Sequence, residues 1–539
     1  MKDNRLRAPS TDGALLAVPP LDEVASTFKA NASRLSSWEH DFQGRPASRL
    51  RQQVHREVMA AARSFLTRHE LDVPECAGAV PPIVTPLIVT GHQPELFHPG
   101  VWVKNFTTAR LARVYGGLGL NLIVDNDLPK ASSIRVPSTE GGRARTVRVD
   151  FDHWKGESPY EDLLVQDEGI FASFGRRVRE VLDESITDPI VDDFWPKAVR
   201  RTGSVRTLGL RLALARREVE ASWGVCNLEV PLSHLCQTDG FYWFASHLLA
   251  QLPRFQEIHN TALAEYRAHY GIRSTHHPVA ALVVQGDWRE APFWIWRRGE
   301  PRRRALLVRQ DRRTMLLRIA GEDDPVLELP LAPDREACCA VERLRELAGR
   351  SIRLRTRALT TTLFARYLLG DLFIHGIGGA KYDELGDSIA RRFFGIEPPG
   401  FLTLSLTAWP GLPDRRGTTC ELAAINRHLR DLTFNPDRHL DEPLSVEIRN
   451  LIVAKREAIA RQGQSRRERI DRFHAIRRIN ESLQSLVTGL ENSLRLKRRQ
   501  VVADLEWNRL VHNREYAFVL HSARRLRELM TRITEPVAR

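Results

Sequence analysis

Two short apolar runs, separated by a helical pattern, constrain the fold of this chain more than any other feature. The run 87–89 leads into a polar loop, 91–100, which is followed by a helical pattern over about 101–115 and by a second apolar run, 120–124. A strand, a helix and a second strand this close together form a βαβ unit, whose strands are parallel. Ligands of such sheets bind beyond the carboxyl ends of the strands, so we expect a site near the loop and near residues 125–127.

The same sheet is predicted to receive two more strands late in the sequence. Residues 372–375 and 401–406 are short apolar runs, and a glycine-rich turn over 376–380 separates the first of them from a helix that we expect to begin near Lys381. Because this order again alternates strand and helix, the predicted class is α/β, with a parallel sheet as its core.

Two long regions differ from this core. Between 151 and 345, helical patterns alternate with short strands, one of them expected over 278–284, and with charged turns, which predicts a mixed α and antiparallel β insertion. From about 440 to 535 the pattern is helical almost throughout, and apolar residues recur at spacings of three and four, as in a seam against another helix or a second copy. The residues of this seam are Phe473, Ile476, Ile479, Leu483, Leu486, Leu490 and Leu494.

The length of 539 residues exceeds what one hydrophobic core usually supports, so more than one domain is expected. The predicted division has five segments. They are an N-terminal helical segment of the core over 1–80, the first part of the core over 81–150, the insertion over 151–345, the second part of the core over 346–435 and a C-terminal helical domain over 436–539.

Composition narrows the class of protein further. The six cysteines are scattered without a C-x-x-C pair, which argues against a disulfide framework or a zinc ribbon and favours the reducing cytoplasm. We recognise no signal peptide and no apolar run of about 18 residues that could span a membrane. The net charge of 80 − 67 = +13 is compatible with an anionic partner. Nucleic acid is not the expected one, because aromatic and basic residues do not alternate beyond Trp294 and Trp296.

The polar loop carries the first candidate residues. His92 and His98 could stabilise negative charge that develops on a transferred group, and Lys104, one helical turn past Gly100, could reach a ligand above the start of the helix. Ordinary loop residues and a solvated lysine would give the same pattern, so both interpretations stay open. After the second strand, Asp125 and Asp127 could bind an amine, a hydroxyl or Mg²⁺, or could cap a turn.

The second cluster follows the strand 372–375. Gly378 and Gly379 could let a phosphate approach the backbone, or could serve a tight turn with positive φ. Asp383 and Glu384 could bind substrate, although the helix dipole alone favours acidic residues there.

Two further groups receive a structural interpretation. His276 and His277 lack a third ligand, so no metal site is predicted. The run 302–304, three arginines, is interpreted as a solvated hairpin turn, with an acidic substrate or an RNA backbone as the alternative.

The segment 90–100 together with Lys104 resembles a motif of the cysteine-adding enzyme family of bacillithiol biosynthesis (BshC). The acidic run 125–127, the triplet 357–359, the Gly378–Gly379 pair and the helical C-terminus follow in the order seen in that family, over roughly 85–535. His92 departs from the family motif, which has glutamine there, and the run 125–127 lacks the family's histidine. The departures lie at the expected site and the scaffold is retained, so a divergent member is expected.

The resemblance implies a Rossmann-like core with inserted connecting domains and a C-terminal coiled coil that forms a homodimer. It implies a ligase that forms an amide between an amino acid, cysteine in the family, and an anionic amino-sugar-type amine, with ATP or another adenine nucleotide, and Mg²⁺ with it, as the candidate source of activation. Residues expected at the catalytic centre are His92, His98, Lys104, Asp125 and Asp127. Those expected around the nucleotide are Gly91, Gln93, Gly100, Gly378, Gly379 and Lys381, and those around the substrates are Asn126, Arg357, Asp383 and Glu384.

Two other functions remain open from the sequence. One is a nucleotidyltransferase with a fold like the class I aminoacyl-tRNA synthetases, in which the loop histidines line a phosphate site. The other is a protein without enzymatic activity that binds RNA or another protein through its long helices.

Overall fold

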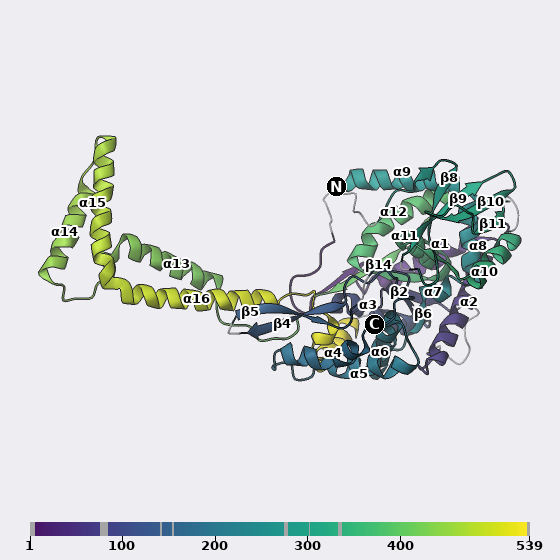
Figure 1. Cartoon of the computed structure of the whole chain (residues 1–539), viewed down its shortest axis with the longest axis horizontal. Helices are drawn as coiled ribbons and strands as arrows, with labels where there is room; N and C mark the ends of the chain where they lie inside the picture. Colours follow the sequence, from purple (N-terminus) through teal and green to yellow (C-terminus); the bar gives the residue numbers. More distant parts are fainter. Residues whose placement is uncertain are drawn as a thin grey trace. The chain divides into compact units, whose positions relative to one another are not determined.

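The computed structural model describes residues 6–75, 85–140, 143–153, 156–273, 279–300, 302–331 and 337–535 (Figure 1). The chain divides into two compact units. The sheet unit comprises Met1–Val136, Arg148–Gly411 and Arg514–Arg539, and the helical unit comprises Pro137–Val147 and Leu412–Asn513. Both helices and strands are abundant, which confirms the predicted α/β class at this level.

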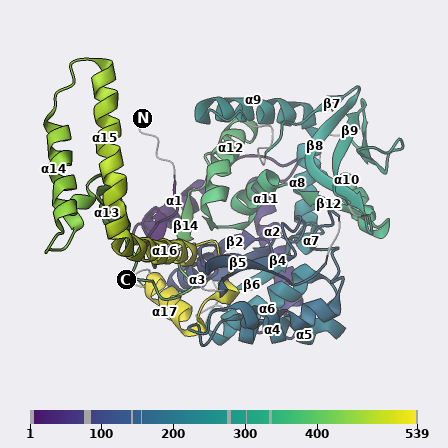
Figure 2. The same ribbon diagram turned by 60° about the vertical axis from the view of Figure 1, so that its left-hand side comes forward.

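A six-stranded sheet lies at the centre of the sheet unit (Figures 1 and 2). Its order is β1-β14-β13-β2-β3-β6, and all neighbours are parallel except β1, which pairs antiparallel with β14. The predicted parallel sheet is therefore confirmed. The strands are β1 (Leu15–Val18), β2 (Leu87–His92), β3 (Leu118–Ile123), β6 (Leu228–Pro231), β13 (Leu372–His375) and β14 (Phe401–Leu406).

The order of the parallel strands reverses between β2 and β13. From β2 the chain proceeds through β3 to β6 on one side, and it later returns to the other side of β2 to add β13 and then β14. Thr90 is paired with Ile374 across this boundary, so the two strands end side by side. In parallel sheets, this reversal point is where the loops diverge and leave room for a ligand.

The helices α3 (Pro99–Val114) and α12 (Ile377–Phe393) begin just beyond this reversal point. His98 caps α3 by accepting a hydrogen bond from the Gly100 N–H, and Pro99 stands in the first turn, where its missing N–H is harmless. The prediction of a glycine-rich turn before Lys381 is wrong. Gly378 and Gly379 lie inside the first turn of α12, and neither has a positive φ.

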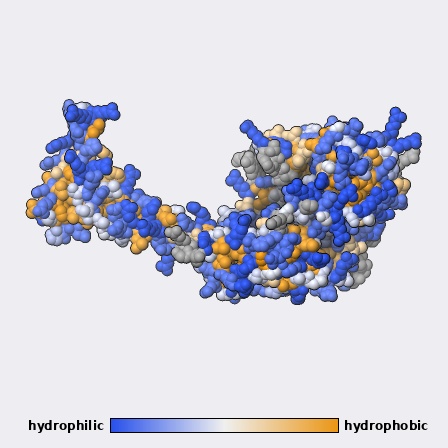
Figure 3. Space-filling view, in the orientation of Figure 1, coloured by the Kyte–Doolittle hydropathy of each residue, from blue (hydrophilic) through white to orange (hydrophobic). Residues whose placement is uncertain are grey.

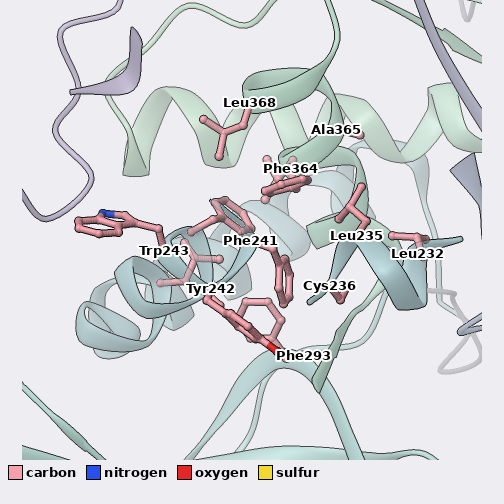
Figure 4. Close-up of a cluster of buried hydrophobic side chains, with 14 of the residues drawn as sticks. Leu232, Leu235, Cys236, Phe241, Tyr242, Trp243, Phe293, Phe364, Ala365 and Leu368 are labelled. Carbon is pink, nitrogen blue, oxygen red and sulfur yellow. The ribbon is translucent and has the colours of Figure 1, made fainter. Parts of the chain in front are cut away.

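A large hydrophobic cluster packs against the sheet. Leu87, Val89 and Leu120 belong to a large buried cluster with residues of α2, α8 and α12. Figure 4 shows part of this cluster, in which the aromatic rings of Phe241 and Phe364 lie 5.9 Å apart. Burial of this apolar surface is the main contribution to the stability of the unit.

A second sheet lies mostly within the region predicted to contain an antiparallel insertion, and its pairings are antiparallel as expected. Its strand β12 (Ile352–Thr356) follows residue 345, so the insertion extends into the segment that was predicted as the second part of the core. The prediction of a strand over 278–284 is wrong for the residues that the structure describes. Of these, only Val284 belongs to a strand, the short β7 (Val284–Gln285), which pairs with β8 (Trp288–Arg297), and Pro278 lies outside the described residues. The other strands are β9 (Arg304–Gln310), β10 (Thr314–Ile319) and β11 (Leu327–Pro330).

Two strands of the parallel sheet were not anticipated. β6 lies inside the region 151–345, and its pattern is interrupted by Glu229, whose buried carboxylate binds Arg216 at 2.8 Å. β1 lies inside the segment 1–80, which was expected to be helical. The remaining helices of the unit are α1 (Val24–Ser36), α2 (Ala47–Arg68), α4 (Glu168–Val181), α5 (Val191–Arg200), η1 (Arg201–Gly203), α6 (Leu208–Ser222), α7 (Leu232–Leu235), α8 (Asp239–Ala250), α9 (Leu252–Tyr270), α10 (Cys338–Gly349), α11 (Ala358–Phe364), the π-helical η2 (Ala365–Leu369), η5 (Phe518–Leu520) and α17 (Ala523–Thr534).

The helical unit contains most of the region predicted to be helical at the C-terminus. Its α14 packs against α15, and its α13 packs against both α15 and α16. The tip of a hairpin formed by β4 (Ser133–Glu140) and β5 (Arg143–Asp150) also belongs to this unit, whereas α17 belongs to the sheet unit. The helices are α13 (Thr419–Phe434), η3 (Pro436–His439), α14 (Val446–Ala460), α15 (Arg466–Gln484), η4 (Ser485–Val487) and α16 (Thr488–Val511).

The apolar seam of this unit is only partly covered. Leu483 is fully buried, but Phe473 is 58% exposed and Leu486 is 49% exposed. Orange patches among the blue surface of these helices are visible in Figure 3. Within the described part of the chain, no helix combines the length and apolar character that crossing a bilayer requires.

Candidate functional site

His92 ends β2 and is held in a buried network. Its Nε2 lies 3.1 Å from Asn105 Oδ1, and Asn105 in turn donates to the carboxylate of Glu220 at 2.7 Å. Burial, followed by the nearby charge of Lys104, holds the pKa of His92 well below its usual range. The imidazole is therefore neutral at physiological pH, and α3 fixes its orientation.

Lys104 is a buried ammonium beside the same strand end. Its Nζ donates to the Gly91 carbonyl at 2.9 Å, and burial lowers its pKa to about 8. In the part of the chain that the structure describes, no carboxylate pairs with it. A buried cation without a counter-ion is unfavourable, so an anionic ligand here would compensate its charge.

His98 and two glycines of the loop have packing roles. His98 Nδ1 caps α3, its Nε2 lies 3.8 Å from Glu515, and burial lowers its pKa to about 4. A Cβ on Gly100 would lie 2.3 Å from the Leu406 carbonyl oxygen, and one on Gly91 would lie 3.1 Å from Leu122 Cβ. Close backbone approach therefore accounts for both glycines without a ligand.

The acidic run after β3 is divided between the core and the surface. Asp125 accepts hydrogen bonds from both the N–H and the hydroxyl of Ser233, at 2.9 and 2.5 Å. Burial, and then the charge of Glu161, raise the pKa of Asp125 to about 7. Asn126 is also buried and donates to the Thr356 carbonyl at 2.8 Å.

Asp127 connects the first two predicted clusters. One of its oxygens accepts from Gln93 at 2.8 Å, and the other lies 3.2 Å from the guanidinium of Arg303. The loop after β2 and the run after β3 therefore meet at one place, as the βαβ pattern predicts.

The cluster after β13 contains a buried ionic network. Asp383 Oδ2 lies 2.5 Å from His375 Nε2 and 2.8 Å from Arg366. Burial would raise the pKa of Asp383, but the adjacent His375 and Arg366 hold it below its usual range. Asp383 thus ties α12 to the end of β13 and to η2, and its carboxylate already has two partners.

The other residues of this cluster differ in exposure. Gly376 and Gly378 face open space, whereas a Cβ on Gly379 would lie 2.8 Å from His375 Nδ1. Lys381 is exposed, and Glu384 is exposed and accepts a 2.5 Å hydrogen bond from Tyr270 on α9. Glu384 therefore points to α9.

A cavity of about 300 Å³ adjoins the end of β3. Its polar lining combines Asn126 and Asp127 with Arg303, which precedes β9, and Arg357, which follows β12. The guanidinium of Arg357 donates to Glu290 at 2.6 Å and lies 4.2 Å from the ring centre of Trp294. This size suits a small metabolite, and the lining offers both positive and negative groups.

The interpretation of the arginine run as a solvated turn is wrong for Arg303. Its side chain is mostly buried and also donates to the Asn126 carbonyl at 2.7 Å, whereas Arg302 is exposed and pairs with Glu157 at 3.2 Å. For Arg303 the sequence offered a site role only as the alternative, and it gave no site role to Trp294, Arg366 or His375. A strand ending in histidine before a glycine pair was an available signal for His375.

The arrangement can bind a ligand with groups of both signs. Arg303 and Arg357 can hold an anionic substituent, and Asp127 can hold an amine or hydroxyl. Among the described residues, no group of three or more His, Cys, Asp or Glu side chains is arranged to hold a metal ion. His276 and His277 lie outside the described residues.

A search with models of known protein families and a search of curated protein sequences each give no match to this chain.

Proposed function

We propose that this chain is an enzyme with a Rossmann-like core that joins the carboxylate of an amino acid to an amine, as its resemblance to the BshC family implies. The main support is the reversal of strand order between β2 and β13, where Lys104 presents a buried ammonium that no described carboxylate pairs with. The strand order β14-β13-β2-β3-β6 matches the order in which Rossmann-type sheets are assembled.

A nucleotide is the proposed source of activation. Phosphate groups would fit above the start of α12, where Gly376 and Gly378 leave the backbone open and Lys381 is exposed. ATP would supply the phosphoryl or adenylyl group that activates the carboxylate. The ammonium group of the second substrate would lose a proton to solvent, and its nitrogen would then attack the activated carbonyl carbon. The phosphate-bearing group would leave with its bonding electron pair, and the amide nitrogen would release a second proton.

The cavity beside β3 is proposed to receive the amine substrate. Asp127 would accept a hydrogen bond from its ammonium group, and Arg303 and Arg357 would bind its anionic substituents. His92, neutral and fixed by Asn105, would hold the end of β2 in place beside the transferred group.

The direct test is thermal stabilisation of the purified chain by ATP, ADP and single amino acids. We expect ATP to raise the melting temperature of the wild type, and Lys104→Ala to abolish this rise. Lys130→Ala is the matched control, because Lys130 is 72% exposed and pairs with Glu95. The absence of any shift with every nucleotide in the wild type would contradict the proposal.

A nucleotidyltransferase is the second candidate function, and the position of two histidines near the reversal point favours it. Product analysis separates it from the ligase. Chain, ATP and an amino acid are incubated with an amino sugar, and the products are identified by mass spectrometry. An amide product supports the ligase, whereas a nucleotide–substrate adduct without amide supports the transferase. A deletion strain that lacks a small thiol and accumulates an amino-sugar precursor would support cysteine as the amino acid.

A homodimer is part of the proposal. The exposed apolar side chains of Phe473, Leu486 and Leu490 would be covered by the helical unit of a second copy.

A further inference from the structure

A second cavity lies in the sheet unit, between α5, α6 and the segment that follows α2. Its volume is about 510 Å³, and it shares no lining residue with the cavity beside β3. The helices α5 and α6 pack against each other, as Figure 2 shows. None of its lining residues has a role in the proposed reaction.

Four basic side chains line this second cavity. Lys197, Arg200 and Arg201 come from α5 and η1, and Arg217 comes from α6. Glu218 holds two of them together, since Arg200 donates to its Oε2 at 2.5 Å and Arg201 Nε donates to its Oε1 at 3.0 Å. The two guanidinium groups therefore already share one anionic group, the carboxylate of Glu218.

Arg217 adds a buried positive charge to the wall of the cavity. The residue is fully buried and donates to the Asp72 carbonyl at 3.1 Å. Its Nε has no hydrogen-bond partner, and no described carboxylate forms an ion pair with it. The buried carboxylates of Glu220 and Glu229 pair with Arg216 instead, at 2.7 and 2.8 Å.

The surroundings of the cavity are also electropositive. Burial, and then the charges of Arg201 and Arg68, lower the pKa of the neighbouring His69. Glu70 and Asp72 line the cavity too, but both are exposed to solvent. Water screens exposed carboxylates, so they oppose an anion less than the buried guanidinium attracts one.

We propose that this second cavity binds a small phosphorylated molecule through Arg200, Arg201 and Arg217. Guanidinium groups bind phosphate oxygens in pairs of parallel hydrogen bonds, and three of them line this cavity. The volume exceeds that of a bare phosphate and suits a phosphorylated metabolite. Binding displaces the carboxylate of Glu218 from Arg200 and Arg201.

Isothermal titration of the full chain with pyrophosphate tests this proposal. We expect Arg200→Gln to raise the dissociation constant about tenfold, the effect of losing one charge-assisted hydrogen-bonding group. Arg176→Gln is the matched control and should leave the dissociation constant unchanged. Arg176 is 68% exposed and pairs with Glu180 on α4, as the 67% exposed Arg200 pairs with Glu218.

A second variant is expected to act in the opposite direction. Glu218→Gln frees Arg200 and Arg201 from their shared carboxylate, so it should bind pyrophosphate at least about threefold more tightly. A misfolded variant would not bind pyrophosphate more tightly, so misfolding cannot explain this gain in affinity. Weaker binding by Glu218→Gln would overturn the proposal, and so would the absence of heat in the wild type.

Two further titrations locate and identify the ligand. Lys104→Ala, at the proposed nucleotide site, should bind pyrophosphate like the wild type, and loss of binding in that variant would place the anion at the nucleotide site and overturn the proposal. Citrate should bind more weakly than pyrophosphate. Tighter binding of citrate would overturn the assignment of a phosphorylated ligand.

Discussion

The edge of the parallel sheet and the helical unit place their side chains in opposite ways. At the sheet edge the buried residues include charged or ionisable ones, namely Lys104, Asp125 and Asp383, whereas the helical unit leaves the apolar Phe473 and Leu486 exposed. Each arrangement is unfavourable for an isolated chain, because burial of charge and exposure of apolar surface both raise the free energy of the folded state. The comparison teaches that the two proposed partners differ in kind: buried charge favours a small ligand at the sheet edge, and exposed apolar surface favours a second copy of the chain at the helices.

The largest expected effect tests whether the ionic network at the sheet edge is structural. Arg366→Met removes a partner of the buried Asp383, and we expect a loss of ~3–5 kcal/mol in the free energy of unfolding. Urea denaturation followed by circular dichroism measures it. Arg391→Met on α12, the helix that carries Asp383, is the control, because its pair with Glu397 is exposed and contributes at most ~1 kcal/mol. Similar losses of unfolding free energy in both variants would show that the buried ion pair contributes no more to stability than the exposed one.

Asp125 should make stability depend on pH. The unfolded chain releases this proton near its ordinary pKa of 3.8, whereas the folded protein retains it up to about 7. Stability is therefore lost as pH rises between these two values. From about pH 5 to pH 8 the wild type should lose ~3 kcal/mol relative to Asp125→Asn, which has no proton to release.

The measurement is the free energy of unfolding at several pH values for the wild type, Asp125→Asn and Asp311→Asn. Asp311 is exposed, so its variant should follow the wild type. Parallel curves for the wild type and Asp125→Asn would show that Asp125 is ionised in the folded protein.

Lys104→Met should stabilise the protein while removing ligand binding. Burial lowers the pKa of Lys104 to about 8 from an ordinary 10.5, so the charged form is less favourable in the folded than in the unfolded protein. Below about pH 8 the wild type bears the full free-energy cost of burying this charge. We expect a gain of ~1–2 kcal/mol near pH 7 that disappears as pH approaches 10.5, since the lost hydrogen bond to Gly91 offsets part of the gain. Thermal unfolding at both pH values measures it. A destabilised variant would show that Lys104 supports the fold.

The smallest effect on folding is expected in the helical unit. Phe473→Ser should change the free energy of unfolding of a monomer by at most ~0.5 kcal/mol, because the side chain is 58% exposed. It should nevertheless shift the mass in sedimentation from dimer to monomer. The control is Leu483→Ala, a buried position where we expect a loss of ~2–5 kcal/mol. A wild type that sediments as a monomer would contradict the proposed homodimer.

Several elements could be located from the sequence because their signals are local. The strands β2, β3, β13 and β14 are short apolar runs bounded by glycine, proline or aspartate, and each was placed within a few residues. β6 was missed because Glu229 interrupts its apolar run. Its burial becomes favourable only once Arg216 folds against it.

The candidate site was predictable only in part, for a related reason. Residues that follow parallel strands are brought to one edge by the sheet, so the contact between Gln93 and Asp127 follows from the βαβ pattern. Arg303 reaches the same place from a hairpin of the second sheet, and nothing near it in the sequence indicates this. The glycines Gly91 and Gly100 were assigned to a ligand, but the distances show that neighbouring backbone and side chains also require them.

The sequence by itself determined the class of fold, the parallel sheet and the two loops at its edge, because hydrophobic periodicity and turn residues act over a few positions. Only the tertiary structure decided which charges are buried, which are paired and which side chains line a cavity. Pairs such as Asp127 with Arg303 join residues far apart in the chain, and their burial depends on every element packed between them. Electrostatic energies depend on that burial, so the chemistry of the site emerges only with the fold.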